Sequence, residues 1–127
     1  MPSAISVVDD DASVRAATNN LLKSRGYLVH TFASAEEFLR SPHLNETACV
    51  IADVEMSVMG GLDLLTTMRT RGYDVPFIFI TAFPDEGVRT RALTAGAICF
   101  LAKPFAAPAL IMCLDTALKG YRGGPGT

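Results

Sequence analysis

The sequence lacks the features of several large protein classes. It contains no tryptophan and only 3 cysteines in 127 residues, and its 11 Lys and Arg are balanced by 13 Asp and Glu. The formal net charge of −2 argues against the basic surface of a nucleic-acid-binding domain. The longest apolar run, residues 105–114, is interrupted by Pro108 and is too short to span a bilayer. We therefore expect no contact of this domain with nucleic acid or membrane.

The cysteines Cys49, Cys99 and Cys113 are scattered, odd in number and surrounded by apolar residues. This pattern favours thiols packed in the core of a protein from a reducing compartment, with a disulfide or a metal site as the alternatives. The first residues show no basic segment followed by an apolar run, so we expect no signal peptide. Together these features predict a soluble, cytoplasmic protein.

Half of the residues are hydrophobic and 19% are charged, which indicates a folded chain with its own core. Short apolar runs rich in β-branched residues alternate with segments of helical period. The predicted strands are residues 4–8, 27–32, 49–52, 77–80 and 98–101, and the predicted helices lie near residues 14–22, 34–39, 62–68, 85–95 and 108–118.

Five such βα units predict an α/β fold with a single doubly wound parallel sheet, because parallel crossovers are right-handed and cover both faces of a sheet. Ser34, followed three residues later by Glu37, predicts a capped helix start, and Gly96 predicts a helix end. We expect one domain over residues 1–119. The glycine-rich residues 120–127 are predicted to be a flexible tail or the start of a linker to an output domain.

Polar residues follow four of the predicted strands, at the sheet edge where doubly wound folds bind ligands. Asp11 is best explained as the N-cap of the helix that follows it. The others call for a chemical explanation. They are Asp9 and Asp10 after the first strand, Asp53 after the third, Thr81 after the fourth, and Lys103 with Pro104 after the fifth.

Carboxylates that converge at one edge repel each other unless a cation or a proton relieves them, and Mg²⁺ is a suitable cation because it prefers oxygen ligands. Lys103 adds a positive charge suited to a phosphoryl oxygen, and Thr81 adds a hydroxyl. Carboxylates, Mg²⁺, lysine and hydroxyl form the set needed to transfer a phosphoryl group to a carboxylate. Asp53 is the best candidate nucleophile because its strand should lie at the centre of the sheet.

These residues carry a family resemblance. The segments Val-Val-Asp-Asp-Asp at 7–11, Asp-Val-Glu-Met-Ser-Val-Met-Gly-Gly at 53–61, Thr-Ala at 81–82 and Phe-Leu-Ala-Lys-Pro-Phe at 100–105 follow one another in this order. The order and approximate spacing resemble the receiver domain of two-component response regulators, over residues 5–118. The resemblance implies a flavodoxin- or receiver-like sheet with strand order 2-1-3-4-5.

The resemblance also implies roles for the acidic residues. Asp53 would accept a phosphoryl group from a sensor histidine kinase. Mg²⁺, or Mn²⁺, would be bound directly by Asp10, Asp53 and the backbone carbonyl of Glu55, and by Asp9 through a water molecule. The implied chemistry is confined to phosphorylation and autodephosphorylation of the chain itself, so we expect a signalling switch and not an enzyme.

Residues on the neighbouring strands would respond to the phosphoryl group. Lys103 would pair with it, Thr81 and Ala82 would contact it, and Phe100 would turn inward. By the same resemblance, the Lys103–Pro104 peptide bond is expected to be cis.

Glu55 and Phe83 should flank the phosphoryl group and tune its hydrolysis, because a large aromatic side chain could obstruct the attacking water. Ser57 stands where the family usually has a proline, which predicts a looser loop with intact chemistry.

Three alternatives stay open. Glu55 lies two residues after Asp53, as the general acid does in aspartate-nucleophile phosphatases, although 127 residues leave no room for a cap domain. A flavin-binding electron carrier would need a Ser/Thr/Gly-rich phosphate cradle where the three aspartates stand. A degenerate receiver that takes no phosphate is disfavoured because every key residue is present.

The family further implies a phosphorylation-dependent homodimer through the fourth helix, fifth strand and fifth helix, where Arg89 and Arg91 offer charges. It also implies an output that controls transcription.

His30 and His43 are far from any cysteine or carboxylate cluster in the sequence, so we expect them to be isolated and solvated.

Overall fold

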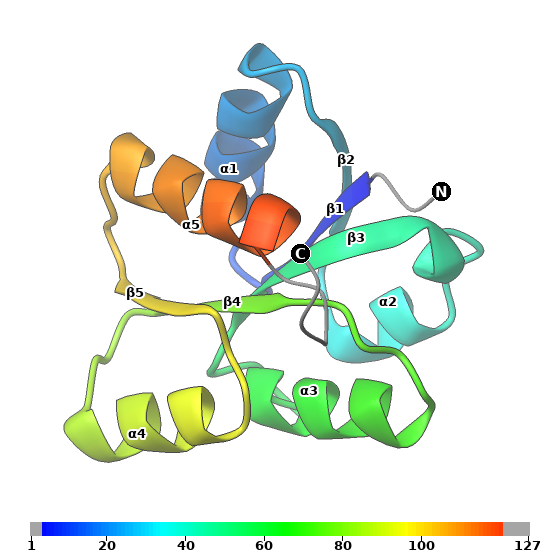
Figure 1. Cartoon of the computed structure of the whole chain (residues 1–127), viewed down its shortest axis with the longest axis vertical. Coiled ribbons are helices and arrows are strands. Elements are labelled where there is room, and N and C mark those ends of the chain that lie inside the picture. The colour runs from blue at the N-terminus through cyan, green and yellow to red at the C-terminus, as the bar shows by residue number, and fades with distance from the viewer. Residues whose placement is uncertain (1–3, 121–127) are drawn as a thin grey trace.

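The computed structural model describes residues 4–120, which form a five-stranded parallel sheet covered by helices on both faces (Figure 1). The strand order is β2-β1-β3-β4-β5, as predicted. The elements are β1 (Ala4–Val8), α1 (Ala12–Ser24), β2 (Leu28–Phe32), α2 (Ala35–Leu39), the 3₁₀ turn η1 (Leu44–Glu46), β3 (Thr47–Asp53), α3 (Gly61–Thr70), β4 (Phe77–Thr81), α4 (Glu86–Thr94), β5 (Cys99–Ala102) and α5 (Ala107–Gly120).

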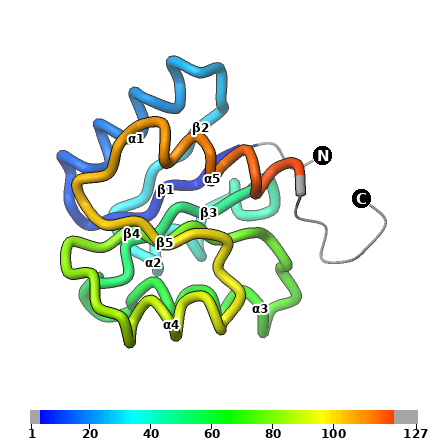
Figure 2. Tube along the Cα trace, turned by 60° about the vertical axis from the view of Figure 1, so that its left-hand side comes forward, coloured from blue at the N-terminus to red at the C-terminus, as the bar shows by residue number. Residues whose placement is uncertain are grey.

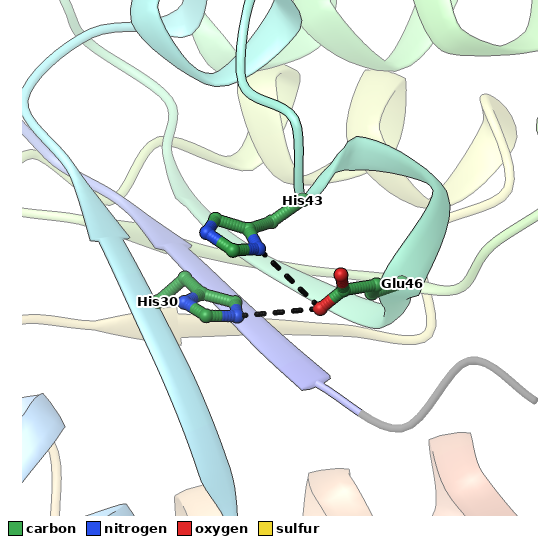
Figure 3. Close-up of side chains that lie close together, drawn as sticks. All are labelled: His30, His43 and Glu46. Carbon is green, nitrogen blue, oxygen red and sulfur yellow. Dashed lines mark ion pairs between the residues drawn. The ribbon is translucent and has the colours of Figure 1, made fainter.

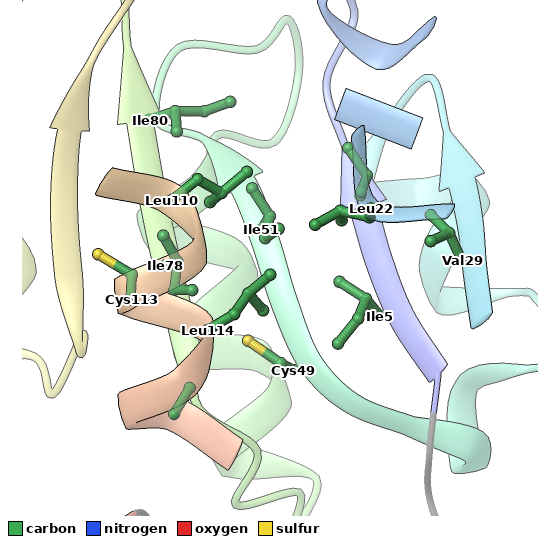
Figure 4. Packing of buried hydrophobic residues seen from close by; sticks show 12 residues of the cluster. Ile5, Leu22, Val29, Cys49, Ile51, Ile78, Ile80, Leu110, Cys113 and Leu114 are labelled. Atoms are coloured by element: carbon green, nitrogen blue, oxygen red, sulfur yellow. The ribbon is translucent and has the colours of Figure 1, made fainter. Parts of the chain in front are cut away.

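The central strands β1, β3 and β4 are buried and largely apolar on both faces, since each face of the sheet packs against helices, whereas the edge strand β2 alternates buried and more exposed residues. Successive side chains of a strand point to opposite faces, and β3 follows this rule. Ile51 belongs to the core under α1 and α5, while its neighbour Val50 belongs to the core over α2, α3 and α4. Figure 2 shows the two helix layers on either side of the sheet, and Figure 4 shows Ile51 with Ile5 and Leu110 in the first core.

Local signals set the helix ends close to where the sequence predicts them. The Asp11 carboxylate accepts a hydrogen bond from the backbone N–H of Ser13 at 2.9 Å, and the Ser34 hydroxyl accepts one from Glu37 at 3.0 Å. Such caps satisfy N–H groups that have no partner within the helix. Gly96 ends α4 with a φ of +109°, a conformation that favours glycine.

The carboxyl-terminal helix runs one residue into the predicted tail. α5 ends at Gly120, and residues 121–127 of that tail lie outside the described residues. Within residues 4–120, no helix has the length and apolar character needed to cross a membrane.

The prediction of packed thiols is wrong for two of the three cysteines. Cys99 on β5 and Cys113 on α5 form a disulfide, with their Cα atoms 6.1 Å apart. α5 folds back over the sheet edge that carries β5, and this return brings together residues 14 positions apart. Cys49 is a buried free thiol as predicted, and burial raises its pKa to about 12, so it stays protonated and unreactive.

The junction of β3 and α3 leaves no space for a side chain at Gly61. A Cβ atom there would lie 2.5 Å from the Asp53 carbonyl oxygen and 2.9 Å from Cε1 of Phe79. The Gly61 N–H also donates to the Val54 carbonyl at 3.0 Å, so the helix start is tied to the end of β3. This close approach positions the loop that follows Asp53.

We predict that Gly61→Ala lowers the free energy of unfolding by about 1–3 kcal/mol, because the backbone must shift to admit the methyl group. Urea unfolding measures the change. The matched control is Gly87→Ala in α4, where the nearest atom to a new Cβ is 3.6 Å away. That control should be neutral or stabilising by up to about 1 kcal/mol. Equal losses in the two variants would contradict the steric explanation.

Candidate functional site

The polar residues predicted at the strand ends meet at one edge of the sheet. Asp9 directly follows β1, Asp53 ends β3, Thr81 ends β4, and Lys103 directly follows β5. The strands are parallel and adjacent in the order β1-β3-β4-β5, so their carboxyl ends lie side by side. The sheet topology therefore brings together residues separated by up to 94 positions.

The Lys103 ammonium group joins the two buried carboxylates of this edge. Its Nζ lies 2.9 Å from Oδ2 of Asp9 and 2.8 Å from Oδ2 of Asp53. Asp9 is completely buried, and Asp53 retains 5% of its surface. Buried like charges repel strongly, and a cation between them offsets that repulsion.

The pKa values of Asp9 and Lys103 are both raised in this cluster. Burial raises the pKa of Asp9, and the charge of Asp53 raises it further, against the lowering effect of the Asp11 N–H and of Lys103. Burial alone would lower the pKa of Lys103, but its hydrogen bonds to Asp53 and Asp9 outweigh this and raise it. Lys103 is therefore firmly charged at neutral pH.

Glu55 and Thr81 form a contact that the sequence analysis did not anticipate. The Thr81 hydroxyl donates a hydrogen bond of 2.5 Å to Oε1 of Glu55 and accepts one of 3.0 Å from the Phe83 N–H. The Glu55 N–H in turn donates to Oδ1 of Asp53 at 3.0 Å. Glu55 follows β3 and Thr81 ends the neighbouring strand β4. From the sequence, only the order of the strands could have predicted this contact.

Arg15 is a second residue that the sequence analysis missed. It lies in the first turn of α1, and its Nη1 donates a 2.7 Å hydrogen bond to the backbone carbonyl of Asp9. The Asp9 side chain accepts the Asp11 N–H at 2.8 Å. These bonds fix the turn that carries the aspartates.

Asp9, Asp10 and Asp53 could hold a metal ion, because one carboxylate oxygen from each lies within 4.8 Å of the others. Asp10 is exposed, so water can complete the coordination from the open side. A donor set of oxygens alone suits a hard cation such as Mg²⁺, which keeps several water ligands. The residues present therefore fit the cation predicted from the sequence.

The loop after Asp53 contains a strained residue next to the unusual Ser57. Val58 is 94% exposed and has a φ of +70°, a left-handed conformation that is rare for a β-branched side chain. The Met59 N–H donates to the Ser57 carbonyl at 2.8 Å. The loop that carries Glu55 is thus held in an unfavourable backbone conformation.

The remaining predicted residues lie on β5 or in the segments that follow β4 and β5. Phe100 is half-buried on β5, opposite Phe79 of β4, while Ala82 is exposed and the Phe83 side chain is 73% exposed. The peptide bond between Lys103 and Pro104 is cis.

Comparison with known proteins agrees with this geometry. The profile of the response regulator receiver domain matches residues 5–115. The chain belongs to this family. Residues 5–115 thus form a receiver domain, the signalling domain of two-component systems, whose family features are phosphorylation and Mg²⁺ at an acidic pocket.

Among the relatives of this receiver domain is the response regulator protein TodT of Pseudomonas putida, 37% identical over 92% of this chain and 52% of its own length. The transcriptional regulatory protein FixJ of Bradyrhizobium diazoefficiens is 34% identical over 91% of this chain and 56% of its own length. The structure of the response regulator StyR superposes with a TM-score of 0.86 at 38% identity, covering 94% of this chain and 60% of StyR. The chain spans about half the length of the curated relatives named here.

We predict that Lys103→Met lowers the free energy of unfolding by roughly 3 kcal/mol at neutral pH, because it leaves two buried carboxylates unpaired. The raised pKa of Asp9 means that its ionisation costs stability as pH rises above the usual value of 3.8. The loss should therefore shrink when acid protonates Asp9, and Mg²⁺ should restore part of it at neutral pH.

Urea unfolding at neutral and acidic pH, with and without Mg²⁺, measures these effects. Lys119→Met is the matched control, because Lys119 pairs with Asp115 at 3.4 Å on the surface, and its side chain is 77% exposed. It should change stability by less than about 0.5 kcal/mol. An equal, pH-independent loss in both variants would show that Lys103 has no special electrostatic role.

Proposed function

We propose that Asp53 accepts a phosphoryl group from a sensor histidine kinase and that the receiver domain then changes conformation to control an output. The observation that carries this proposal is the position of Lys103 Nζ, 2.8 Å from the Asp53 carboxylate and 2.9 Å from Asp9. A lysine so placed can neutralise the phosphoryl oxygens as they approach Asp53. Asp53 lies at the carboxyl end of β3 and retains 5% of its surface.

In the proposed reaction a carboxylate oxygen of Asp53 attacks phosphorus. A new P–O bond forms, the bond between phosphorus and the donor's imidazole nitrogen breaks, and the imidazole leaves with the electron pair. Hydrolysis later returns Asp53 and inorganic phosphate when water attacks the same phosphorus. Both steps act on the chain's own side chain, so we propose a switch rather than an enzyme with an external substrate.

We propose that Asp10, Asp53 and the backbone carbonyl of Glu55 bind the metal directly and that Asp9 contacts it through water. The three carboxylates within 4.8 Å of one another support this assignment. When bound, Mg²⁺ or Mn²⁺ supplies positive charge that stabilises the phosphoryl oxygens in the transition state. The chain's own contribution is to hold Asp53 in place, through the Glu55 N–H on Oδ1 and Lys103 on Oδ2.

The conformational change proposed here begins at Thr81. Its hydroxyl would leave Glu55 and bind a phosphoryl oxygen, assisted by the backbone at Ala82, and Phe100 would move into the space released on the inner side. The support is that Thr81 lies at the end of β4, beside β3, and that Phe100 lies half-buried on β5. Phosphate biases this equilibrium through its different contacts in the two states.

The phosphatase alternative would need Glu55 as a general acid. In this structure Oε1 of Glu55 accepts a hydrogen bond from the Thr81 hydroxyl, so the carboxyl group is engaged by a residue of the chain itself. Membership of the receiver family also favours the signalling function. We therefore keep the switch as the proposed function.

We further propose a cytoplasmic regulator that dimerises on phosphorylation through α4, β5 and α5 and controls transcription through an output domain. The names of the relatives TodT and FixJ, a response regulator protein and a transcriptional regulatory protein, support the output. The disulfide between Cys99 and Cys113 joins β5 to α5 within the proposed dimer face.

We predict that incubation with Mg²⁺ and a small acyl phosphate adds about 80 Da to the intact chain, the mass of one phosphoryl group. The gain should require Mg²⁺ and disappear in Asp53→Asn, which keeps the size of the side chain but lacks the nucleophile. Intact mass spectrometry measures it, and light scattering of the same sample tests dimerisation. A gain that persists in Asp53→Asn would refute Asp53 as the phosphoacceptor.

We also predict that Phe83→Ala shortens the lifetime of the phosphorylated protein about threefold, which corresponds to a barrier lowered by about 0.65 kcal/mol, since about 1.4 kcal/mol corresponds to a factor of ten. The backbone N–H of Phe83 donates to the Thr81 hydroxyl, and we propose that its exposed ring obstructs the approach of water to the phosphoryl group. Release of inorganic phosphate gives the rate. Met112→Ala is the control, because Met112 on α5 is 71% exposed and Phe83 is 73% exposed. A rate for Phe83→Ala no faster than that of the parent would exclude the obstruction.

A further inference from the structure

The two histidines expected to be isolated lie against each other. The rings of His30 and His43 stack with centroids 3.9 Å apart and planes 11° apart. Oε1 of Glu46 lies 3.7 Å from Nε2 of His30 and 3.4 Å from Nδ1 of His43 (Figure 3). The expectation of isolated histidines is therefore wrong, because the chain return between β2 and β3 brings positions 30 and 43 together.

The backbone that carries this cluster is well defined. His30 is the middle residue of β2, opposite Ser6 of β1. His43 precedes η1, and the Glu46 N–H donates to the His43 carbonyl at 3.0 Å. In a 3₁₀ turn the side chains of residues i and i+3 lie one above the other, so Glu46 necessarily faces His43.

The nitrogen atoms that face Glu46 have unused capacity to bind a ligand. Nε2 of His30 and Nδ1 of His43 are buried, and neither makes a hydrogen bond within the described residues. Buried polar atoms are normally satisfied, so two such atoms beside one carboxylate call for an explanation.

We propose that His30, His43 and Glu46 bind a zinc ion. Their donor atoms lie within 4.8 Å of one another. Zinc with ligands about 2.0–2.1 Å away in a tetrahedron places neighbouring donor atoms about 3.3–3.4 Å apart. The two N···O distances, 3.4 and 3.7 Å, are close to this spacing. Two imidazoles and one carboxylate leave the fourth position for water, as in open zinc sites.

Zinc binding requires a small adjustment of the rings. The lone pairs of nearly parallel rings do not converge, so one ring must tilt toward the other. The terminal ring torsion of histidine is soft, and the His43 side chain is 43% exposed, which gives it room to turn. The ion would then fasten the segment before β3 to the edge strand β2.

This site differs from the aspartate cluster in place and in chemistry. Glu46 directly precedes β3, whereas Asp53 ends it, and a seven-residue strand extends about 20 Å. The aspartate cluster offers oxygen donors, which suit Mg²⁺, whereas imidazole nitrogens suit zinc. The two clusters can therefore be titrated separately.

The test is a calorimetric titration of Zn²⁺ into the disulfide-intact full chain in the presence of excess Mg²⁺. We expect one bound Zn²⁺ per chain, and a loss of affinity of at least about tenfold in His43→Ala and in Glu46→Gln. Asp115→Asn is the matched control, because the Asp115 side chain is 59% exposed and that of Glu46 is 52% exposed. The control should keep the parent affinity.

Imidazole nitrogen NMR spectra provide a readout that does not depend on affinity. The chain has 2 histidines, so both ring signals can be followed, and zinc should shift both. Zn²⁺ binding that is lost in Asp10→Asn while the histidine signals stay unmoved would place the ion at the aspartates and overturn the proposal. Absence of binding, or equal affinity in the parent and His43→Ala, would overturn it as well.

Discussion

The ammonium group of Lys103 is the interaction on which the functional edge depends. Asp9 and Asp53 are buried on adjacent strands, and two unpaired carboxylates at such a position would oppose folding. The lysine that relieves them comes from the end of β5, two strands away from β3. The order of the strands, the length of the lysine side chain and the burial of the aspartates are therefore mutually constrained.

Much of the fold could be predicted because its cause is local. Apolar runs such as residues 77–80 must lie in a sheet covered on both faces, and Asp11 and Ser34 begin helices through their own side chains. The edge that carries Asp9, Asp53 and Lys103 followed from one topological rule, that parallel strands end together. The roles of individual residues at this edge came instead from the family resemblance.

The features that could not be predicted depend on packing between distant elements. The disulfide of Cys99 with Cys113 arises where α5 crosses β5, and the stack of His30 on His43 arises where the chain returns from β2 to β3. In neither pair does the separation along the sequence indicate that the two side chains will meet. Sequence periodicity tells which face a residue occupies, but it does not tell which side chain from another element meets it there.

The hydrogen bond from Thr81 to Glu55 limits what the site can do at any moment. A hydroxyl has a single proton with which to donate, and the Thr81 hydroxyl donates its hydrogen bond to Glu55. A phosphoryl oxygen on Asp53 would require the same proton, so the two arrangements exclude each other. If the proposed exchange at Thr81 is the switch, the response of each molecule would be all-or-none. A graded signal would then be expressed as the fraction of molecules in which the Thr81 hydroxyl donates to the phosphoryl group and no longer to Glu55.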